Sequence, residues 1–249
     1  MNKYEPQWRP AIPGELIYPN QVHVWRTYLD LTKLQRERLL GILSTDEVER
    51  AGRFHFERHK ERFIAARGIL RLILGSYLGK NPHKLRFGYT NKGKPVLAIN
   101  ADYDALSFNL SHSDTYALYA VTKHRNIGID IEHIRDDVAI GQIAQKFFSQ
   151  GEIRSLEQIH KNKLHQLFFQ YWTRKEALLK AIGEGISSPM ELVDVSQISG
   201  AIILPGTLPG DEKGTRRWYV QDLFPGHNYA AAIAVEEVQC DLSYMHYSI

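Results

Sequence analysis

Two carboxylates stand two residues apart in the stretch NIGIDIE, residues 126–132, where isoleucine alternates with small or polar residues. As a β-strand, this stretch places the isoleucines on one face and Gly128, Asp130 and Glu132 on the other. Neighbouring carboxylates repel each other unless a cation lies between them. Oxygen ligands at this spacing suit Mg²⁺, which leaves its other positions to water and phosphate oxygens. The motif alone also fits a solvated strand face of an antiparallel sheet.

A second group follows some forty residues later, in the segment YWTRKEALLKAIGEG, residues 171–185. Trp172, Glu176 and Lys180 are spaced by four, so a helix presents them on one face. A glutamate and a lysine at this spacing usually form an exposed pair worth about 0.3–0.5 kcal/mol. Trp172 on the same stripe indicates that the face is partly buried, and a buried glutamate requires a cation or a hydrogen-bond donor. A metal ion held by the two earlier carboxylates would provide that cation.

The composition is that of a soluble globular protein: 249 residues, 43% hydrophobic and 24% charged, with a formal net charge of +3. This length fits one large domain or two small ones. The single cysteine, Cys240, excludes an intramolecular disulfide and predicts a cytoplasmic protein. Residues 1–20 contain no continuous apolar run, which predicts neither a signal peptide nor a membrane anchor. The charge balance gives no reason to expect a nucleic-acid partner.

The elements that must position these residues are predicted from periodicity and capping signals. Capping boxes at residues 44–47 and 149–152 predict helix starts. Helices are expected over residues 30–43, from 45 with a break near 54–58, and over 60–78, 138–148, 149–157 and 163–182. Strands are expected over residues 22–28, 85–89, 95–99, 106–110, 116–122, 126–132, 192–195, 201–204, 217–223 and 229–235.

Each half of the chain therefore carries helices first and antiparallel strands after them. This order predicts an α+β fold of two subdomains, residues 1–124 and 125–249, although no repeat is visible in the sequence.

Several motifs together carry a resemblance to a known family. The pair GIDIE and WTRKEALLKAIGEG resembles the signature of the 4′-phosphopantetheinyl transferase superfamily, G-x-D-x-E followed by W-x-x-K-E-A-x-x-K-x-x-G-x-G. The run FFSQGE at residues 147–152 is similar to the family's RFF-S-x-x-E element, with Lys146 in place of the frequent arginine. The elements GKP at 93–95 and NLSHS at 109–113 resemble the larger, Sfp-type branch.

The resemblance implies two similar α+β subdomains related by pseudo-twofold symmetry, with the active site at their interface. It implies transfer of the 4′-phosphopantetheine arm of coenzyme A to a serine of an apo acyl or peptidyl carrier protein, with release of adenosine 3′,5′-bisphosphate. By position, Asp130, Glu132 and Glu176 resemble the ligands of Mg²⁺, with Mn²⁺ as the alternative ion. Glu176 also resembles the group that removes the serine proton, directly or through a water.

The same resemblance implies the contacts to coenzyme A. Lys180 resembles the lysine at the pyrophosphate, Lys94 the GKP lysine at the phosphates, and Ser111 with His112 the pair at the nucleotide end. Arg53 and Arg67 lie in the stretch that supplies basic contacts to the 3′-phosphate. The catalytic set implied is thus Asp130, Glu176 and Lys180.

The amphipathic segment 138–148 is where a carrier helix is expected to dock. A monomer is expected, because one chain holds both halves. The phenylalanine pairs at 147–148 and 168–169 are expected in the core.

Two other functions fit some of these residues. A Mg²⁺-dependent nucleotide or phosphate-ester hydrolase would use the same carboxylates and lysine, with water in place of the carrier serine. A basic nucleic-acid-binding module would use the arginine-rich stretch 50–71. That stretch is interleaved with core-type residues and lacks the aromatic platforms expected of RNA binders.

Overall fold

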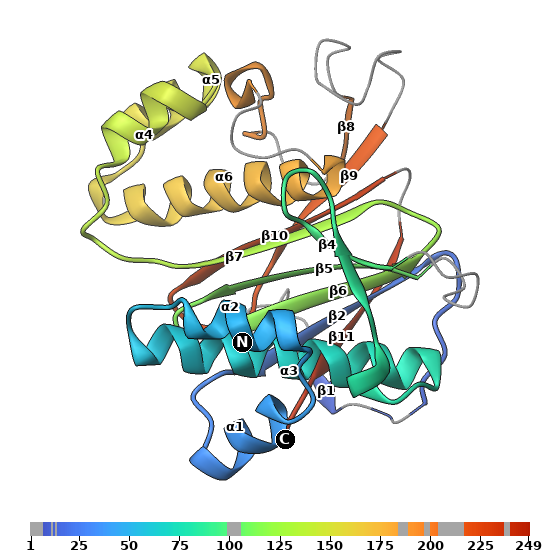
Figure 1. Ribbon diagram of the computed structural model, residues 1–249. Helices are drawn as coiled ribbons and strands as arrows, with labels where there is room; N and C mark the ends of the chain where they lie inside the picture. Colours follow the sequence, from blue (N-terminus) through green and yellow to red (C-terminus); the bar gives the residue numbers. More distant parts are fainter. Residues whose placement is uncertain are drawn as a thin grey trace.

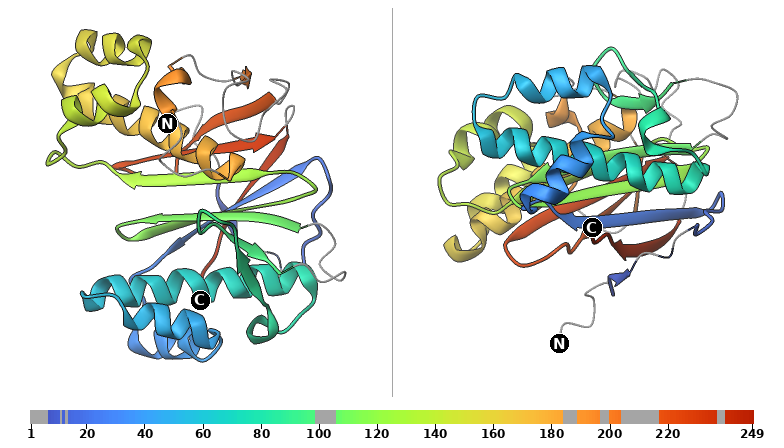
Figure 2. Two further views of the ribbon diagram at one scale, coloured as in Figure 1. Left: turned by 45° about the horizontal axis from the view of Figure 1, so that its top comes forward. Right: turned by 60° about the horizontal axis from the view of Figure 1, so that its bottom comes forward.

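Two β-sheets lie face to face, and one long helix covers the outer face of each sheet, so the layers run helix–sheet–sheet–helix (Figures 1 and 2). This arrangement confirms the α+β class predicted from the order of elements. The computed structural model describes residues 7–10, 12, 14–98, 106–183, 189–196, 200–203, 217–236 and 240–249.

The first sheet has the strand order β1-β11-β2-β6-β5. Its strands are β1 (Arg9–Pro10), β2 (Gln21–Tyr28), β5 (Leu106–Ser113), β6 (Tyr116–Lys123) and β11 (Asp241–His246). Strand β11 pairs in parallel with β2, so the end of the chain returns to the sheet built by the first half. The predicted boundary between residues 124 and 125 therefore stays a prediction. Strand β11 lies after this boundary in the sequence but belongs to the first sheet.

The second sheet has the order β7-β10-β9-β8, and its neighbouring strands are all antiparallel. Its strands are β7 (Ile127–His133), β8 (Gly200–Ile203), β9 (Arg217–Leu223) and β10 (Tyr229–Glu236). A separate hairpin pairs β3 (Phe87–Tyr89) with β4 (Pro95–Leu97). In Figure 1 this hairpin rises from the helices of the first half toward α6.

Helices begin where the capping signals predict them. They are α1 (Lys33–Leu40), α2 (Thr45–Gly52), α3 (Glu57–Leu78), α4 (Ile140–Phe147), α5 (Gln150–Gln158) and α6 (Lys161–Ile182), with short 3-10 helices η1 (Pro82–Lys84) and η2 (Met190–Leu192). The predicted break before the long basic helix separates α2 from α3. Gly79 and Gly183 end the two 22-residue helices, α3 and α6, in the left-handed conformation, with φ of 59° and 87°.

The apolar core lies in three layers. One cluster joins α3 to the first sheet, a second joins α6 to the second sheet, and a third lies between the sheets. The isoleucines of β7, Ile127, Ile129 and Ile131, belong to the layer between the sheets, as their alternation predicts. Phe168 and Phe169 of α6 and the nearby Phe148 are buried in the second cluster, and the partly buried Phe147 packs on it, which confirms the core prediction for these rings.

Side chains of β5 connect the two sheets where no backbone ladder does. Asn109 Oδ1 accepts a hydrogen bond of 2.8 Å from the Ile129 N–H of β7. Ser111 Oγ and Ser113 Oγ, farther along the same face of β5, donate to Asp130 Oδ1 and Glu132 Oε2, each at 2.8 Å. The alternating polar side chains of β5 thereby fix β7 beside the edge of the first sheet.

Two strand predictions need comment. The strand predicted at residues 192–195 is wrong, because η2 and an extended stretch occupy this region. The carbonyl oxygens of Met190 and Val193 accept hydrogen bonds from Lys175 Nζ instead of from a neighbouring strand. The predicted strand 201–204 is observed as β8, although Leu204 lies outside the described residues, as do Ile99, Glu184 and Gly185 of other predictions. None of the described helices has the length and apolar character needed to cross a membrane.

Candidate active site

The polar face of β7 turns toward helix α6, because the isoleucine face is occupied by the core between the sheets. Gly128 is where the helix backbone comes closest: a Cβ at this position would lie 2.0 Å from the Ala177 carbonyl oxygen and 2.4 Å from Ala181 N. Only a residue without a side chain permits this approach. The helix therefore rests directly on the strand and brings its residues 176 and 180 over the carboxylates of β7.

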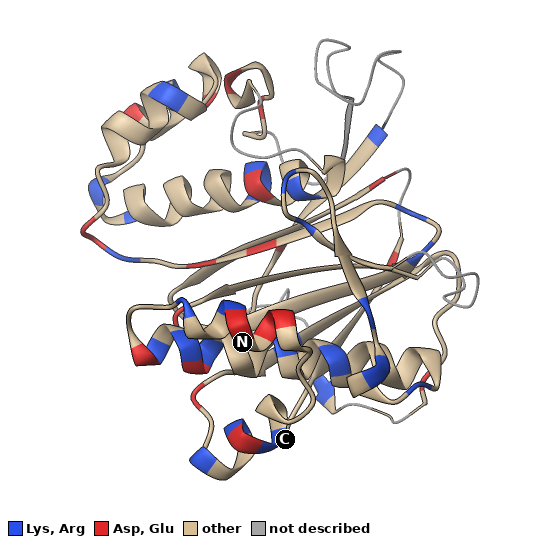
Figure 3. Cartoon of the chain, in the orientation of Figure 1, with Lys and Arg blue, Asp and Glu red and all other residues tan. Residues whose placement is uncertain are grey.

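Lys180 makes the main polar contacts between helix and strand. Its Nζ donates to Asp130 Oδ1 at 2.6 Å and to Ser111 Oγ at 3.0 Å. Asp130 is 3% exposed, so this charge-assisted bond forms away from bulk water. Figure 3 shows the acidic segment of β7 below adjacent acidic and basic segments of α6.

Three carboxyl groups, those of Asp130, Glu132 and Glu176, lie near the single ammonium group of Lys180. Asp130 Oδ2 and Glu176 Oε1 are buried and lack a hydrogen-bond partner within the described residues. Burial first, and then the negative charge of Asp130, raise the pKa of Glu176 to about 7. The same two causes, in the same order, raise the pKa of Glu132. Three acidic groups facing one lysine leave uncompensated negative charge in a poorly hydrated place.

A divalent cation fits this donor set. Oxygen atoms of carboxylates are the ligands that Mg²⁺ prefers, and such an ion would compensate the buried oxygens Asp130 Oδ2 and Glu176 Oε1, which have no hydrogen-bond partner among the described residues. Within the described ranges, no three His, Cys, Asp or Glu side chains stand in a ready-made metal-binding arrangement. Lys180 bonded to Asp130 occupies part of the space between strand and helix, so closing the carboxylates on an ion requires their side chains to move.

A basic pocket of about 530 Å³ adjoins the end of β5. It is lined by Phe54, Arg58, His59, Arg62, His112, Ser113, Asp114, His133 and Arg135. His112 is exposed at the pocket, and desolvation on its protein-facing side, followed by the charges of Lys180, Arg62 and His59, lowers its pKa below the ordinary histidine value. A neutral imidazole among guanidinium groups can bind an anion by hydrogen bonding while the arginines supply charge.

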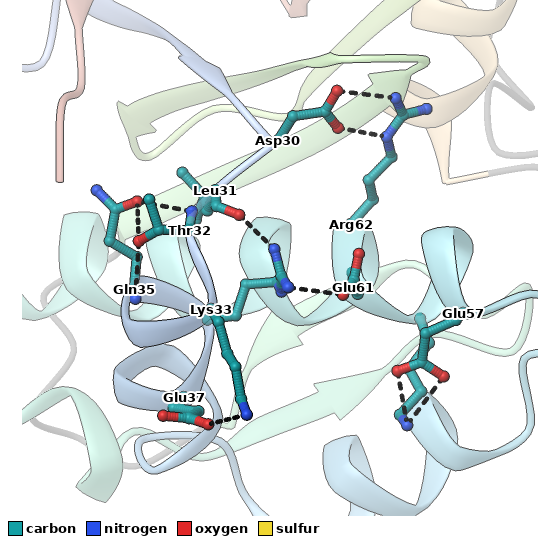
Figure 4. Close-up of polar contacts among 11 residues, drawn as sticks. Asp30, Leu31, Thr32, Lys33, Gln35, Glu37, Glu57, Glu61 and Arg62 are labelled. Carbon is teal, nitrogen blue, oxygen red and sulfur yellow. Dashed lines mark hydrogen bonds and ion pairs between the residues drawn. The ribbon is translucent and has the colours of Figure 1, made fainter.

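The sequence analysis did not select Arg62, although it lies in the same arginine-rich helix as the predicted Arg67. Arg62 reaches the pocket and is held by two bonds to Asp30, of 3.0 and 3.4 Å (Figure 4). A third bond of 2.9 Å joins it to Asp114. Arg67 instead forms a buried ion pair of 2.5 Å with Glu47. Arg53 is exposed just after α2 and does not line the pocket. The structure thus brings neither Arg53 nor Arg67 to the pocket beside His112.

Lys94 connects the hairpin to the second half of the chain. Its Nζ donates to the carbonyl oxygens of Ile127, at 2.9 Å, and Lys180, at 2.7 Å. Burial and the nearby charge of Lys180 lower the pKa of Lys94 to about 8. The predicted contact of Lys94 with phosphates would compete with these two bonds.

Two ion pairs away from β7 also fix helix α6 in its place, and the sequence analysis missed both. Lys175 pairs with Glu152 at 2.9 Å, and all but about 1% of each side chain is buried. Arg174 pairs with Asp222 of β9 through two bonds of 2.6 Å. A lysine or arginine inside an otherwise apolar helix stripe is the sequence signal for such pairs, since a buried charge must find a partner.

Comparison with known proteins places these residues in a family context. A family model described as "4'-phosphopantetheinyl transferase superfamily" matches residues 126–234, and one described as "4'-phosphopantetheinyl transferase, N-terminal" matches residues 31–124. The chain is 39% identical to the 4′-phosphopantetheinyl transferase HetI of Nostoc sp., over 96% of this chain and 98% of that protein. It is 27% identical to the 4′-phosphopantetheinyl transferase Sfp of Bacillus subtilis, over 69% of this chain and 75% of that protein.

Among solved structures, the holo-[acyl-carrier-protein] synthase of Thermotoga maritima matches with a TM-score of 0.31 and 17% identity. The match covers 45% of this chain and 62% of that one.

Replacing Gly128 tests the close approach of α6 to β7. In Gly128→Ala the new methyl group would overlap backbone atoms of the helix, so we expect the free energy of unfolding to fall by about 1–3 kcal/mol. Urea denaturation measures the change. Gly141→Ala is the matched control, because a Cβ there meets open space in helix α4. Equal stability of the two variants would contradict this packing.

The raised pKa of Glu176 predicts a pH dependence of stability in the presence of a metal chelator. A carboxyl with a higher pKa in the folded than in the unfolded protein holds its proton more tightly when folded. Its contribution to stability is therefore present below the ordinary glutamate pKa of 4.5 and is lost as the pH rises through about 7. Between about pH 5 and 7 we expect the wild type to lose more free energy of unfolding than Glu176→Gln. Parallel pH curves for the two proteins would exclude a raised pKa at Glu176.

Proposed function

Because the chain belongs to the 4′-phosphopantetheinyl transferase superfamily, we propose that it transfers the 4′-phosphopantetheine arm of coenzyme A to a serine of an apo acyl or peptidyl carrier protein. Adenosine 3′,5′-bisphosphate is the second product. The observation that carries the proposed site is the pair of buried oxygens on Asp130 and Glu176, next to the ammonium group of Lys180, that have no hydrogen-bond partner in the described part of the chain.

Asp130, Glu132 and Glu176 are proposed to hold Mg²⁺, or Mn²⁺ in its place. Without a cation these carboxylates would repel the pyrophosphate of coenzyme A, which carries negative charge of its own. When bound, the ion neutralises that charge and stabilises the leaving phosphate. Ser111 and Ser113 orient the carboxylates of β7 through hydrogen bonds, leaving other carboxylate oxygens available to the ion.

The reaction replaces the phosphoanhydride bond of the pyrophosphate with a phosphoester bond to serine. The serine Oγ of the carrier forms a bond to the phosphorus of the pantetheine phosphate, and the bond from that phosphorus to the bridging oxygen breaks. The bridging oxygen leaves with the 5′-phosphate of adenosine 3′,5′-bisphosphate. The serine proton passes to Glu176, directly or through a water, because a serine hydroxyl is a weak nucleophile until a base takes its proton. Lys180 is proposed to stabilise the charge that develops on the departing phosphate.

The basic pocket beside His112 is proposed to hold the nucleotide end of coenzyme A. Arg62 and neutral His112 suit a phosphate, through charge and hydrogen bonding respectively. Ser113 joins this pocket to the carboxylates, since it lines the pocket and donates to Glu132 Oε2. Lys94 contributes by holding the hairpin against α6, and its direct contact with coenzyme A stays a prediction.

A carrier protein is proposed to dock at α4, which continues the chain after β7. Ile140, Ile143 and Phe147 are only partly buried against the core, so one apolar stripe of this helix borders solvent. Lys146 lies over the Phe147 ring, with its Nζ 5.0 Å from the ring centroid, and offers a positive charge to an acidic partner helix. A monomeric, cytoplasmic enzyme remains the expectation.

The alternative functions have weaker support. The similar proteins described above are named transferases, which gives no support to a hydrolase. Arg62, Arg67 and Arg71 of the arginine-rich stretch are buried in contacts with carboxylates, so these three add nothing to a basic surface for nucleic acid.

The transfer itself is tested with a panel of apo carrier proteins from fatty-acid, polyketide and nonribosomal-peptide synthases. Each carrier is incubated with the enzyme, coenzyme A and Mg²⁺, and its intact mass is measured. A gain of one phosphopantetheine group on at least one carrier is expected. Release of bisphosphate without mass gain on any carrier would favour the hydrolase instead.

Substitution of the proposed ligands tests their roles. We expect Asp130→Ala and Glu176→Gln each to lower the transfer rate by about two orders of magnitude or more while the protein remains folded. Asp130→Ala should also weaken the activation by Mg²⁺. Rates come from the mass assay and folding from circular dichroism, with Glu157→Gln on the exposed face of α5 as control. Near wild-type transfer by Asp130→Ala would make the metal assignment wrong.

A further inference from the structure

A buried cluster of charges between α2 and α3 holds two cations for one anion. Glu47, Arg67 and Arg71 are each at most 5% exposed. Arg67 Nε donates to Glu47 Oε1 at 2.7 Å, and Arg71 Nε donates to Glu47 Oε2 at 2.6 Å. Arg71 Nη1 is satisfied by the carbonyls of Pro82 and Leu85, at 2.8 and 3.0 Å. Arg71 Nη2 is buried and has no hydrogen-bond partner in the part of the chain that the structure describes.

Arg71 of this cluster lines a hollow of about 740 Å³, whereas Glu47 and Arg67 do not. Arg71 lies in the wall, exposed basic residues Lys84 and Arg86 lie at the mouth with His83, and the first turn of α2 approaches from the opposite side. In Figure 3 basic segments mark η1 and the foot of the hairpin, where the hollow opens. Its lining shares no residue with the pocket beside His112 or with the carboxylates of β7.

The side chains around this hollow carry a net positive charge even when the groups that contact Arg67 and Arg71 are counted. Arg67 and Arg71 lie 4.7 and 5.1 Å from the ring centroid of Phe87, and a cation–π contact compensates a buried guanidinium only in part. Asp46 at the rim is exposed, so solvent screens its charge more than it screens the buried arginines. A cation without a full counter-charge at low dielectric attracts an anion.

We propose that this hollow is a second ligand site of the protein, one that binds the phosphate group of a small molecule. Two features favour phosphate: the cationic side chains of Lys84 and Arg86 line the hollow, and the buried Arg71, whose Nη2 has no hydrogen-bond partner among the described residues, supplies positive charge from behind. The volume exceeds what inorganic phosphate fills, so either a free phosphate ion or the phosphate of a nucleotide is accommodated. Because the hollow is concave and has a buried wall at Arg71, a small molecule suits it better than a polymer or a membrane surface.

The experiment follows backbone amide signals of the full-length protein by two-dimensional NMR while inorganic phosphate is added at constant ionic strength maintained with chloride. Saturable shifts are expected at Thr45, Asp46, His83 and Lys84. The double variant Lys84→Ala/Arg86→Ala should weaken the apparent affinity at these signals by about tenfold or more, because two charge-assisted contacts are lost. The double variant Lys33→Ala/Arg38→Ala removes the same charge from helix α1 and should leave the affinity unchanged.

A second titration with adenosine 3′,5′-bisphosphate separates the two sources of the phosphate group. Tighter binding than inorganic phosphate at the same four signals assigns the site to a nucleotide, and equal or weaker binding assigns it to the free ion. Shifts confined to the signals of Arg58 and His112, shifts that do not saturate, or equal weakening in both double variants would overturn the proposal. Transfer activity is measured separately, so failure of this site leaves the transfer assignment unaffected.

Discussion

Repulsion among Asp130, Glu132 and Glu176 is the constraint on which the rest of the structure depends. Three carboxylates gathered between a strand and a helix are unfavourable until positive charge joins them, and burial makes the repulsion stronger. The ammonium group of Lys180 bonds one oxygen of Asp130. The other oxygen of Asp130 and one oxygen of Glu176 remain buried without partners among the described residues. A folded protein keeps such an arrangement only where packing elsewhere fixes the backbone and where a ligand completes the charge balance.

That packing comes from both sides of α6. Gly128 lets the helix lie against β7, and the pairs Lys175–Glu152 and Arg174–Asp222 fix its other side. The serines of β5 then bring the first half of the chain to the carboxylates of the second half, and Lys94 does the same at the end of α6. The candidate site is therefore built at the junction of the two subdomains, and neither half contains it alone.

Local patterns in the sequence predicted much of this arrangement. The period-two alternation of 126–132 correctly placed isoleucines in the core and carboxylates on the other face, and the capping boxes located the starts of α2 and α5. Strand β11 escaped prediction because its pairing with β2 joins residues more than 200 positions apart, and no local signal encodes that pairing. The choice between Arg62 and Arg67 also depends on tertiary structure: they are five residues apart on α3, so they face different neighbours, one the pocket and one Glu47.

The central claim is that the three carboxylates converge on one divalent ion that also contacts coenzyme A. The most direct measurement is a crystal structure of the protein with Mn²⁺ and coenzyme A, in which anomalous scattering locates the metal. We predict a single Mn²⁺ coordinated by Asp130, Glu132 and Glu176 together with oxygens of the pyrophosphate, with Lys180 moved from Asp130 toward a phosphate. A metal bound elsewhere, or a Glu176 side chain directed away from Asp130 and Glu132 in that complex, would contradict the claim.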